Sequence, residues 1–321
     1  MNYGGEAEAY HLWIGEYKAK IFRGAGFSPP VLILHAHRQN RQAEAYPTDR
    51  FFGTSQWVVA MRRVQLIEIH EQPWFPSFLR DGVTDALQYG MGFLKAYTPI
   101  GAMLQNALGS WDCRSILDLC SGGGGPWPEL SRNLSGSPCG NRIRLSDKFP
   151  NLRAFQNVSA ASGNRITFCA EPVDAMRVPR KLPGFRTMFS AFHHFSPEEA
   201  RAVLQNAVDA GESIGIFEVT RRTASAIGLM IPWALLVFVT SPWIRPFRWS
   251  RLFWTYLIPI VPFVVWFDGV VSCLRTYRPR ELRQIIGKLT GREYEWQVGE
   301  HLGDRGKIPI TFLIGSPRTR F

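Results

Sequence analysis

Cysteine is scarce in this sequence. The 321 residues include five cysteines, an odd number, and their positions match neither a set of metal ligands nor a disulfide framework. This excludes a small disulfide-stabilised fold and indicates a reducing compartment. The first residues also lack the basic and then apolar pattern of a signal peptide. We therefore expect a cytoplasmic protein. His35 and His37 have no further ligands nearby, so no metal site is expected.

Acidic residues are in the minority. The chain has 26 Asp and Glu against 37 Lys and Arg, and its net charge is +11. Such a charge makes nucleic acid or an anionic membrane surface a candidate partner. No basic run is interleaved with aromatic residues, as a nucleic-acid groove would require, and arginines instead flank an apolar region. The composition therefore favours a membrane surface over specific nucleic-acid binding.

Glycine, by contrast, is concentrated at one place. The segment Ile116–Trp127 reads ILDLCSGGGGPW, an apolar run with an acid at Asp118, followed by the four glycines Gly122–Gly125. This order predicts a buried strand that ends in a tight turn, whose backbone N–H groups face a ligand. Pro126 suits the first turn of a following helix. A glycine run alone is also typical of a flexible loop, so the rest of the chain must decide between the two.

A second acid lies where a nucleotide-binding fold needs one. Residues 142–147, RIRLSD, read as a strand that ends in Asp147, which lies 25 positions after Gly122. In dinucleotide-binding folds a carboxylate that binds a ribose hydroxyl follows the loop by roughly 20 positions. The two segments together predict a nucleoside cofactor at the carboxyl ends of parallel strands.

These motifs resemble the cofactor half of the class I S-adenosylmethionine-dependent methyltransferases. The family's loop has the form D-x-G-x-G-x-G; Asp118, Gly122 and Gly124 match it, whereas Cys120 stands in place of the first glycine. The resemblance implies that Asp147 binds the ribose and that Asp174 lies near the adenine amino group. It also implies S-adenosyl-L-methionine as the cofactor. The residues expected to bind it are Asp118, Cys120, Ser121, Gly122, Gly123, Gly124, Asp147, Lys148, Asp174 and Ala175.

The order of predicted elements indicates an α/β fold. Strands are expected near residues 115–119, 143–146, 166–170, 187–191 and 213–219. Helices are expected between them, and this alternation predicts a doubly wound, mostly parallel sheet. Two further strands near the C-terminus, at residues 294–298 and 310–315, predict a hairpin that brings the sheet to seven strands. The resemblance implies a reversed last strand there, which dehydrogenase folds usually lack.

We expect five segments along the chain. Residues 1–60 have no sustained hydrophobic period and are predicted to be a disordered extension or an upstream reading-frame artefact. Residues 61–110 are predicted to form an N-terminal helical cap. The cofactor-binding core is expected at 111–223, and an apolar helical hairpin at 224–274 follows it. Residues 275–321 are expected to complete the core with a helix and the β-hairpin.

The apolar hairpin is the second informative feature of the sequence. Ala224–Ile244 has no charged residue, Leu252–Val271 has only Asp268, and the basic link Arg245–Arg251 joins them. Each run is close to the ~20 residues that cross a bilayer. The prolines, Asp268 and the arginines on both sides of each run conflict with two simple spans. We expect an interfacial or re-entrant hairpin that associates with a membrane through residues 224–271; true spans and a buried lid are the alternatives.

Catalytic candidates follow the fourth and fifth predicted strands. His193 and His194 could remove a proton, because imidazole titrates near neutrality, or they could pack and cap the next helix. Glu218 ends the fifth strand and could orient an acceptor, or pair with Arg221 or Arg222.

Four further residues could reach the same site. Glu68, His70 and Glu71 in the sequence EIHE would face it if the N-terminal helices cover it. Asp268 in an apolar run is a functional candidate, and an ion pair with Arg275 is the plain alternative.

We therefore predict methyl transfer from S-adenosyl-L-methionine to a lipophilic or membrane-associated small molecule. In this family, additions after the fifth strand commonly cover the substrate, so an apolar cover implies an apolar substrate. An NAD(P)-dependent oxidoreductase shares the glycine loop and the ribose acid, but Asp174 and the reversed hairpin disfavour it. A non-catalytic membrane-associated protein with a cofactor-binding fold is disfavoured by the intact acids. The sequence identifies neither the acceptor atom nor the oligomeric state.

Overall fold

The computed structural model describes residues 61–109, 115–134, 142–245, 247–301 and 309–318. All of them belong to one structural unit, Gln56–Phe321. The predictions for residues 1–60, including His35 and His37, lie outside the described residues.

The strands are β1 (Ile116–Asp118), β2 (Ile143–Leu145), β3 (Ile166–Phe168), β4 (Phe185–Phe189), β5 (Ile214–Glu218), β6 (Tyr294–His301) and β7 (Ile310–Pro317). The helices are α2 (Ser77–Phe93), α3 (Gly101–Gly109), α4 (Trp127–Asn133), α5 (Leu152–Ala161), α6 (Pro197–Ala210), α7 (Ala224–Gly228), α8 (Met230–Thr240), α9 (Trp249–Leu252), α10 (Ile260–Arg275) and α11 (Pro279–Ile286).

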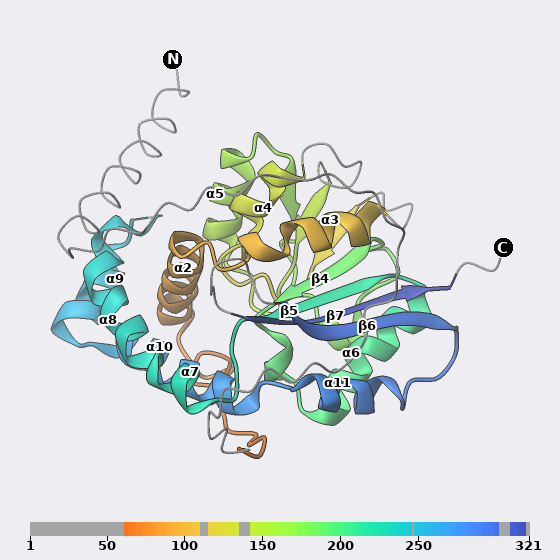
Figure 1. Cartoon of the computed structure of the whole chain (residues 1–321). Helices are drawn as coiled ribbons and strands as arrows, with labels where there is room; N and C mark the ends of the chain where they lie inside the picture. Colours follow the sequence, from red (N-terminus) through yellow and green to blue (C-terminus); the bar gives the residue numbers. More distant parts are fainter. Residues whose placement is uncertain (1–60, 110–114, 135–141, 246, 302–308, 319–321) are drawn as a thin grey trace, which may run out of the picture. The chain divides into compact units, whose positions relative to one another are not determined.

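The strands form one seven-stranded sheet in the order β3-β2-β1-β4-β5-β7-β6 (Figure 1). β1 to β5 pair in parallel. β7 runs antiparallel to both β5 and β6, and its Thr311 lies opposite Glu218. The predicted fold class, a doubly wound sheet with a reversed last strand, is therefore confirmed. The strand order changes direction at β1 and β4, where folds of this kind bind their ligands.

Most strands are shorter than the sequence predicted, and β4 is shifted. It covers Phe185–Phe189 rather than residues 187–191. The cause is Ser190, whose φ of 45° takes the chain out of the extended conformation. The strand therefore ends just before the two histidines, which lie in a short 3₁₀ turn, Phe192–His194.

Two layers of helices cover the sheet. Figure 1 shows α3, α4 and α5 on one face and α6 and α11 on the other. Apolar residues at helical spacing on α6, such as Ala200, Val203 and Leu204, pack against the inner side of β4 and β5. Ser196 starts α6 with a capping box to Glu199, as the Pro197-Glu-Glu sequence predicts.

The predicted N-terminal cap and the apolar hairpin pack against each other and form an apolar cluster of their own. α2 contributes Val83 and Ala86, and the segment α7–α10 contributes Val237, Val261 and Val264. Residues 61–76 contain no helix, so the cap is less helical than expected. We call residues 224–275 the apolar insert from here on.

By length and composition, one described helical stretch, Ala224–Trp243, could cross a membrane. The bent pair Trp249–Leu257 and Ile260–Arg275 passes the same test, with a bend of 77°. Such stretches also occur in soluble proteins, so the finding by itself decides nothing about a membrane.

Candidate active site

A cavity of about 1030 Å³ lies beside the carboxyl ends of β1 to β5. The segments that follow these five strands line one side of it, and α2, α7, α8 and α10 line the other. Ligand pockets commonly measure roughly 300–1,000 Å³, so this one has room for a nucleoside cofactor together with an acceptor. The wall formed by the insert and α2 is mostly apolar and includes Met91, Leu229, Trp233 and Leu236, with a few polar residues such as Gln88 on α2.

The glycine-rich loop forms the cavity wall after β1. Gly122, Gly124 and Gly125 all have positive φ, of 53°, 110° and 56°. Cys120 also has a positive φ, of 56°, at the position where the resemblance leads one to expect glycine. The loop therefore keeps the glycine conformation at this residue despite its Cβ, at a cost of roughly 1–2 kcal/mol. Gly122 and Gly123 present bare backbone to the cavity.

Two of the ten predicted cofactor residues do not line the cavity. The Asp118 side chain is buried beneath the loop, where it accepts hydrogen bonds from Ser121 Oγ at 2.6 Å and Thr187 Oγ1 at 2.7 Å. Gly124 packs against α5, and a Cβ there would lie 2.8 Å from Val158 Cγ2. The structure thus assigns both residues to holding the loop. The remaining eight predicted residues border the cavity.

Burial raises the pKa of Asp118 to about 7, and the hydrogen bonds from Ser121 and Thr187 oppose this only in part. A folded-state pKa above the unfolded one, near 3.9, gives stability that is full below pH ~4 and is lost as the pH rises through ~7. Between pH 5 and pH 8 the free energy of unfolding of the wild type should fall by about 3 kcal/mol relative to that of Asp118→Asn, in which residue 118 does not titrate. Urea unfolding of both proteins at the two pH values tests this. A constant difference would contradict it.

Asp147 and Asp174 follow β2 and β3, in the segments that come after these strands. Asp147 Oδ2 accepts a hydrogen bond from the backbone of Gly122 at 2.8 Å, and its Oδ1 accepts one from Phe149 at 2.8 Å. This carboxylate therefore fixes the loop against β2 while it borders the cavity. Asp174 caps a short 3₁₀ turn by accepting a hydrogen bond from the backbone of Met176 at 2.9 Å.

The predicted catalytic residues are brought together with the EIHE segment. His193 Nδ1 lies 2.7 Å from Glu218 Oε2, and the His193 side chain is almost completely buried. His194 Nδ1 lies 2.9 Å from Glu68 Oε2 and 2.6 Å from Glu71 Oε1. Both histidines border the cavity, whereas Glu218 does not. Of the EIHE segment, His70 and Glu71 border the cavity, whereas Glu68 is fully buried and contacts the histidines.

In this group of histidines and glutamates, opposite charges offset the effect of burial on the pKa values. Burial alone would raise the pKa of Glu218, but the adjacent His193 charge lowers it below its usual range. Burial would likewise lower the pKa of His194, yet Glu68 and Glu71 raise it well above its usual value. The His194 charge in turn outweighs burial at Glu71 and lowers its pKa to about 2.

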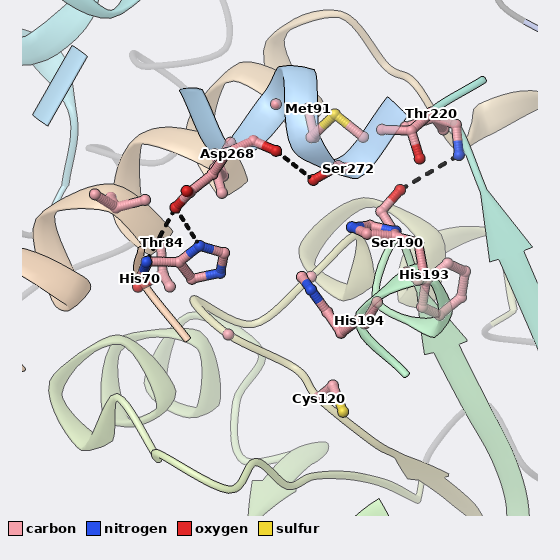
Figure 2. A pocket seen from close by; sticks show the side chains of 18 of the residues that line it. His70, Thr84, Met91, Cys120, Ser190, His193, His194, Thr220, Asp268 and Ser272 are labelled. Carbon is pink, nitrogen blue, oxygen red and sulfur yellow. Dashed lines mark hydrogen bonds and ion pairs between the residues drawn. The ribbon is translucent and has the colours of Figure 1, made fainter. Parts of the chain in front are cut away.

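Asp268 and Arg275 do not pair with each other, contrary to the plain alternative for Asp268. Asp268 accepts hydrogen bonds from the backbones of Ile69 at 2.7 Å and His70 at 3.0 Å, and it lies 2.7 Å from His70 Nδ1 (Figure 2). Arg275 instead donates to Glu71 at 2.9 Å and to the carbonyls of His193 and His194. Sequence reasoning considered Arg275 as a possible partner of Asp268 and missed these contacts.

The alternative pairing of Glu218 with arginine is also absent. Arg221 pairs with Glu300 at 3.0 Å, and Arg222 pairs with Glu281 at 2.7 Å. Glu218 instead accepts a hydrogen bond from the backbone of Phe192 at 2.6 Å. It therefore orients the histidine turn that follows β4.

No family model and no curated protein matches the sequence. Among solved structures, the plantazolicin methyltransferase BpumL in complex with SAH is similar, with 9% identity, a TM-score of 0.45, and coverage of 75% of this chain and 96% of that one. An O-methyltransferase family protein from Burkholderia thailandensis has 16% identity and a TM-score of 0.42; 74% of this chain aligns with 60% of its length.

A structure described as a putative Zn-dependent alcohol dehydrogenase from Rhodobacter sphaeroides is also similar, at 12% identity and a TM-score of 0.39, over 74% of this chain and 98% of that one. Similarities this weak do not identify an activity. The strand order and the reversed β7 of this chain are nevertheless those of the class I S-adenosylmethionine-dependent methyltransferase fold.

Proposed function

We propose that the protein transfers a methyl group from S-adenosyl-L-methionine to a lipophilic small molecule. The observation that carries this is the continuity of one cavity, which runs from the glycine loop and two acids to the apolar wall of the insert. Its first part suits a nucleoside and its second part suits an apolar acceptor. One continuous cavity would therefore hold both reactants together.

The residues of the first part fit the cofactor. Gly122 and Gly123 border the cavity with bare backbone, and Asp147 borders the same space. We assign Asp147 to the ribose hydroxyls and Asp174 to the adenine end, with Lys148 and Ala175 completing that wall. When bound, the cofactor would supply an electrophilic methyl group on a positively charged sulfur.

This chain's own contribution to the reaction is chiefly positioning. Methyl transfer needs the acceptor atom in line with the methyl group, and enclosure beside the cofactor supplies that alignment. His194 borders the cavity between the two parts and is held by Glu68 and Glu71, so it is suited to orienting a polar atom of the acceptor. The apolar wall would exclude water from the remainder of the acceptor.

The insert also supports association with a membrane surface. Twelve large hydrophobic residues between Leu229 and Trp266 are exposed, out of nineteen in the described part of the chain. Exposed apolar side chains that are concentrated in one segment indicate an interaction surface. Because the same insert walls the cavity, a substrate that partitions into lipid could reach the site from the membrane.

Calorimetric titration tests the cofactor assignment. The full-length protein should bind S-adenosyl-L-methionine and S-adenosylhomocysteine, and Asp147→Ala should weaken both at least about tenfold, since a charge-assisted hydrogen bond contributes roughly 1.5–3 kcal/mol. Asp209→Ala, which removes an exposed acid on α6, is the matched control and should bind normally. Binding of NADH in place of the two sulfur nucleosides would replace the proposal with an oxidoreductase.

A further inference from the structure

The histidines and carboxylates beside the apolar wall form a second site within the cavity. Glu68, His70 and His194 each offer a ligand atom, and these atoms all lie within 4.8 Å of one another. The residues come from two segments more than a hundred positions apart, one ahead of α2 and one after β4. We propose that Glu68, His70 and His194 bind a divalent transition-metal ion.

Buried atoms without hydrogen bonds are the first argument. Glu68 Oε2, His193 Nε2 and His194 Nδ1 are all buried, and none has a hydrogen-bond partner among the described residues. Glu68 Oε2 and Glu71 Oε1 lie 2.9 Å and 2.6 Å from His194 Nδ1, so they hold the ring by charge, but neither contact has hydrogen-bond geometry. Buried polar atoms are normally satisfied, so several orphans in one place indicate a missing ligand. A cation between the Glu68 carboxylate and the His194 ring would satisfy Glu68 Oε2 and His194 Nδ1, and it would take the place of the proton on His194.

The orientation of His70 is the second argument. Its Nδ1 lies 2.7 Å from Asp268 Oδ2, and in the neutral tautomer that donates to this carboxylate, Nε2 carries the lone pair. Histidines that bind metals almost always donate their other ring N–H to a carboxylate or carbonyl. Figure 2 shows the His70 ring, held by Asp268, and the His194 ring directed toward the same space. The centres of the two rings are 5.7 Å apart.

Contacts on several sides also hold Glu68 in place. Its side chain is completely buried, and Ser272 Oγ lies 3.1 Å from Oε1. His193 Nε2 lies 3.6 Å from the same oxygen, and His193 is itself oriented by Glu218. Arg275 Nη1 is 3.5 Å from Oε1, which leaves Oε2 for an ion. Glu68 is therefore fixed before any ion binds, which lowers the conformational cost of binding.

The ligand set decides the kind of ion. Two imidazoles and one carboxylate suit Zn²⁺, Mn²⁺ and Fe²⁺, whereas Ca²⁺ and Mg²⁺ prefer sets made only of oxygen ligands. Three protein ligands leave coordination positions open toward the cavity. An ion there could bind a hydroxyl or amine of the acceptor and lower its pKa; this role, unlike the metal site itself, rests on the proposed methyl transfer.

Metal binding to the full-length protein tests the inference directly. After chelator treatment and dialysis, the protein should bind one equivalent of Zn²⁺ by calorimetry, and Co²⁺ should give visible absorption bands of a site with nitrogen ligands. His70→Gln and His194→Gln should each weaken Zn²⁺ binding by about 100-fold, and Asp268→Asn by ~10–100-fold through the orientation of His70. His301→Gln, on the edge strand β6, is the matched control and should bind as the wild type does.

Titration of the same variants with S-adenosylhomocysteine separates the possible failures. Retained binding shows that His70→Gln and His194→Gln are folded, so their loss of Zn²⁺ would support the site. The proposal would be overturned if the wild type bound no Zn²⁺, or if the wild type and both histidine variants bound it equally well. Zn²⁺ binding without any binding of the sulfur nucleosides would keep the metal site and reject the methyltransferase.

Discussion

Replacement of Asp85 by alanine is expected to lower the free energy of unfolding by about 3–5 kcal/mol, the usual cost of removing one partner from a buried ion pair. The Asp85 side chain has no exposed surface, and it lies on α2 facing the insert. Its Oδ2 accepts hydrogen bonds from Arg248 Nε at 2.9 Å and Arg251 Nη1 at 3.1 Å. Its Oδ1 accepts one from Asn151, which caps α5.

One carboxylate therefore joins three elements that are distant in sequence. In Asp85→Ala the Arg251 side chain, which is also fully buried, would lose its carboxylate while it remains away from water. Urea unfolding followed by tryptophan fluorescence measures the loss. Because the insert and α2 form the apolar wall of the cavity, we also expect weaker binding of any apolar ligand.

Asp81→Ala is the matched control for this prediction. Asp81 lies one helical turn earlier on α2, 3.2 Å from Arg248 Nη1, but its side chain is 26% exposed. Exposed ion pairs contribute about 1 kcal/mol or less. Equal losses in Asp81→Ala and Asp85→Ala would show that burial of the charge pair is not what stabilises the insert.

The core of the fold could be predicted because it depends on local sequence. Interactions between residues close in sequence determine each of its elements. The sequence shows them as apolar runs that end in acids, as the glycine loop and as the Pro197-Glu-Glu helix start, and the structure contains all of them. Strand ends were less predictable. β4 ends at Phe189 because Ser190 adopts a positive φ, which neither its residue type nor its neighbours indicate.

The candidate site could be predicted only in part, for a related reason. Asp147, Asp174 and the two histidines follow predicted strands, so the topology alone places them at one edge of the sheet. Glu68 and Asp268 reach that edge from the N-terminal segment and from the insert, and no periodicity encodes their tertiary contacts. The burial of Asp118 beneath the loop was likewise invisible, since the motif gives the position of an acid but not the direction of its side chain.

Replacing Leu235, Val239 and Leu257 of the insert together by glutamate is expected to reduce binding of the protein to lipid vesicles by a factor on the order of 100 or more. Leu235, Val239 and Leu257 are 58%, 65% and 70% exposed, so changing them removes no core packing. Burying a large aliphatic side chain contributes about 1.5–3 kcal/mol, and the triple variant would lose three such contributions and gain charges that anionic lipids repel. Co-sedimentation with phosphatidylcholine–phosphatidylglycerol vesicles measures the effect.

The variant Leu152→Glu controls for the added charge and for the loss of an exposed leucine. Leu152 is 41% exposed but lies at the start of α5, outside the insert. Leu152→Glu should leave vesicle binding unchanged, and binding of the cofactor should persist in both variants. If the triple variant sediments with vesicles as the wild type does, the exposed surface of the insert is not a membrane-binding face. The apolar wall of the cavity would then be explained by a lid over a soluble apolar substrate, since Leu229, Trp233 and Leu236 line it whether or not a membrane is present.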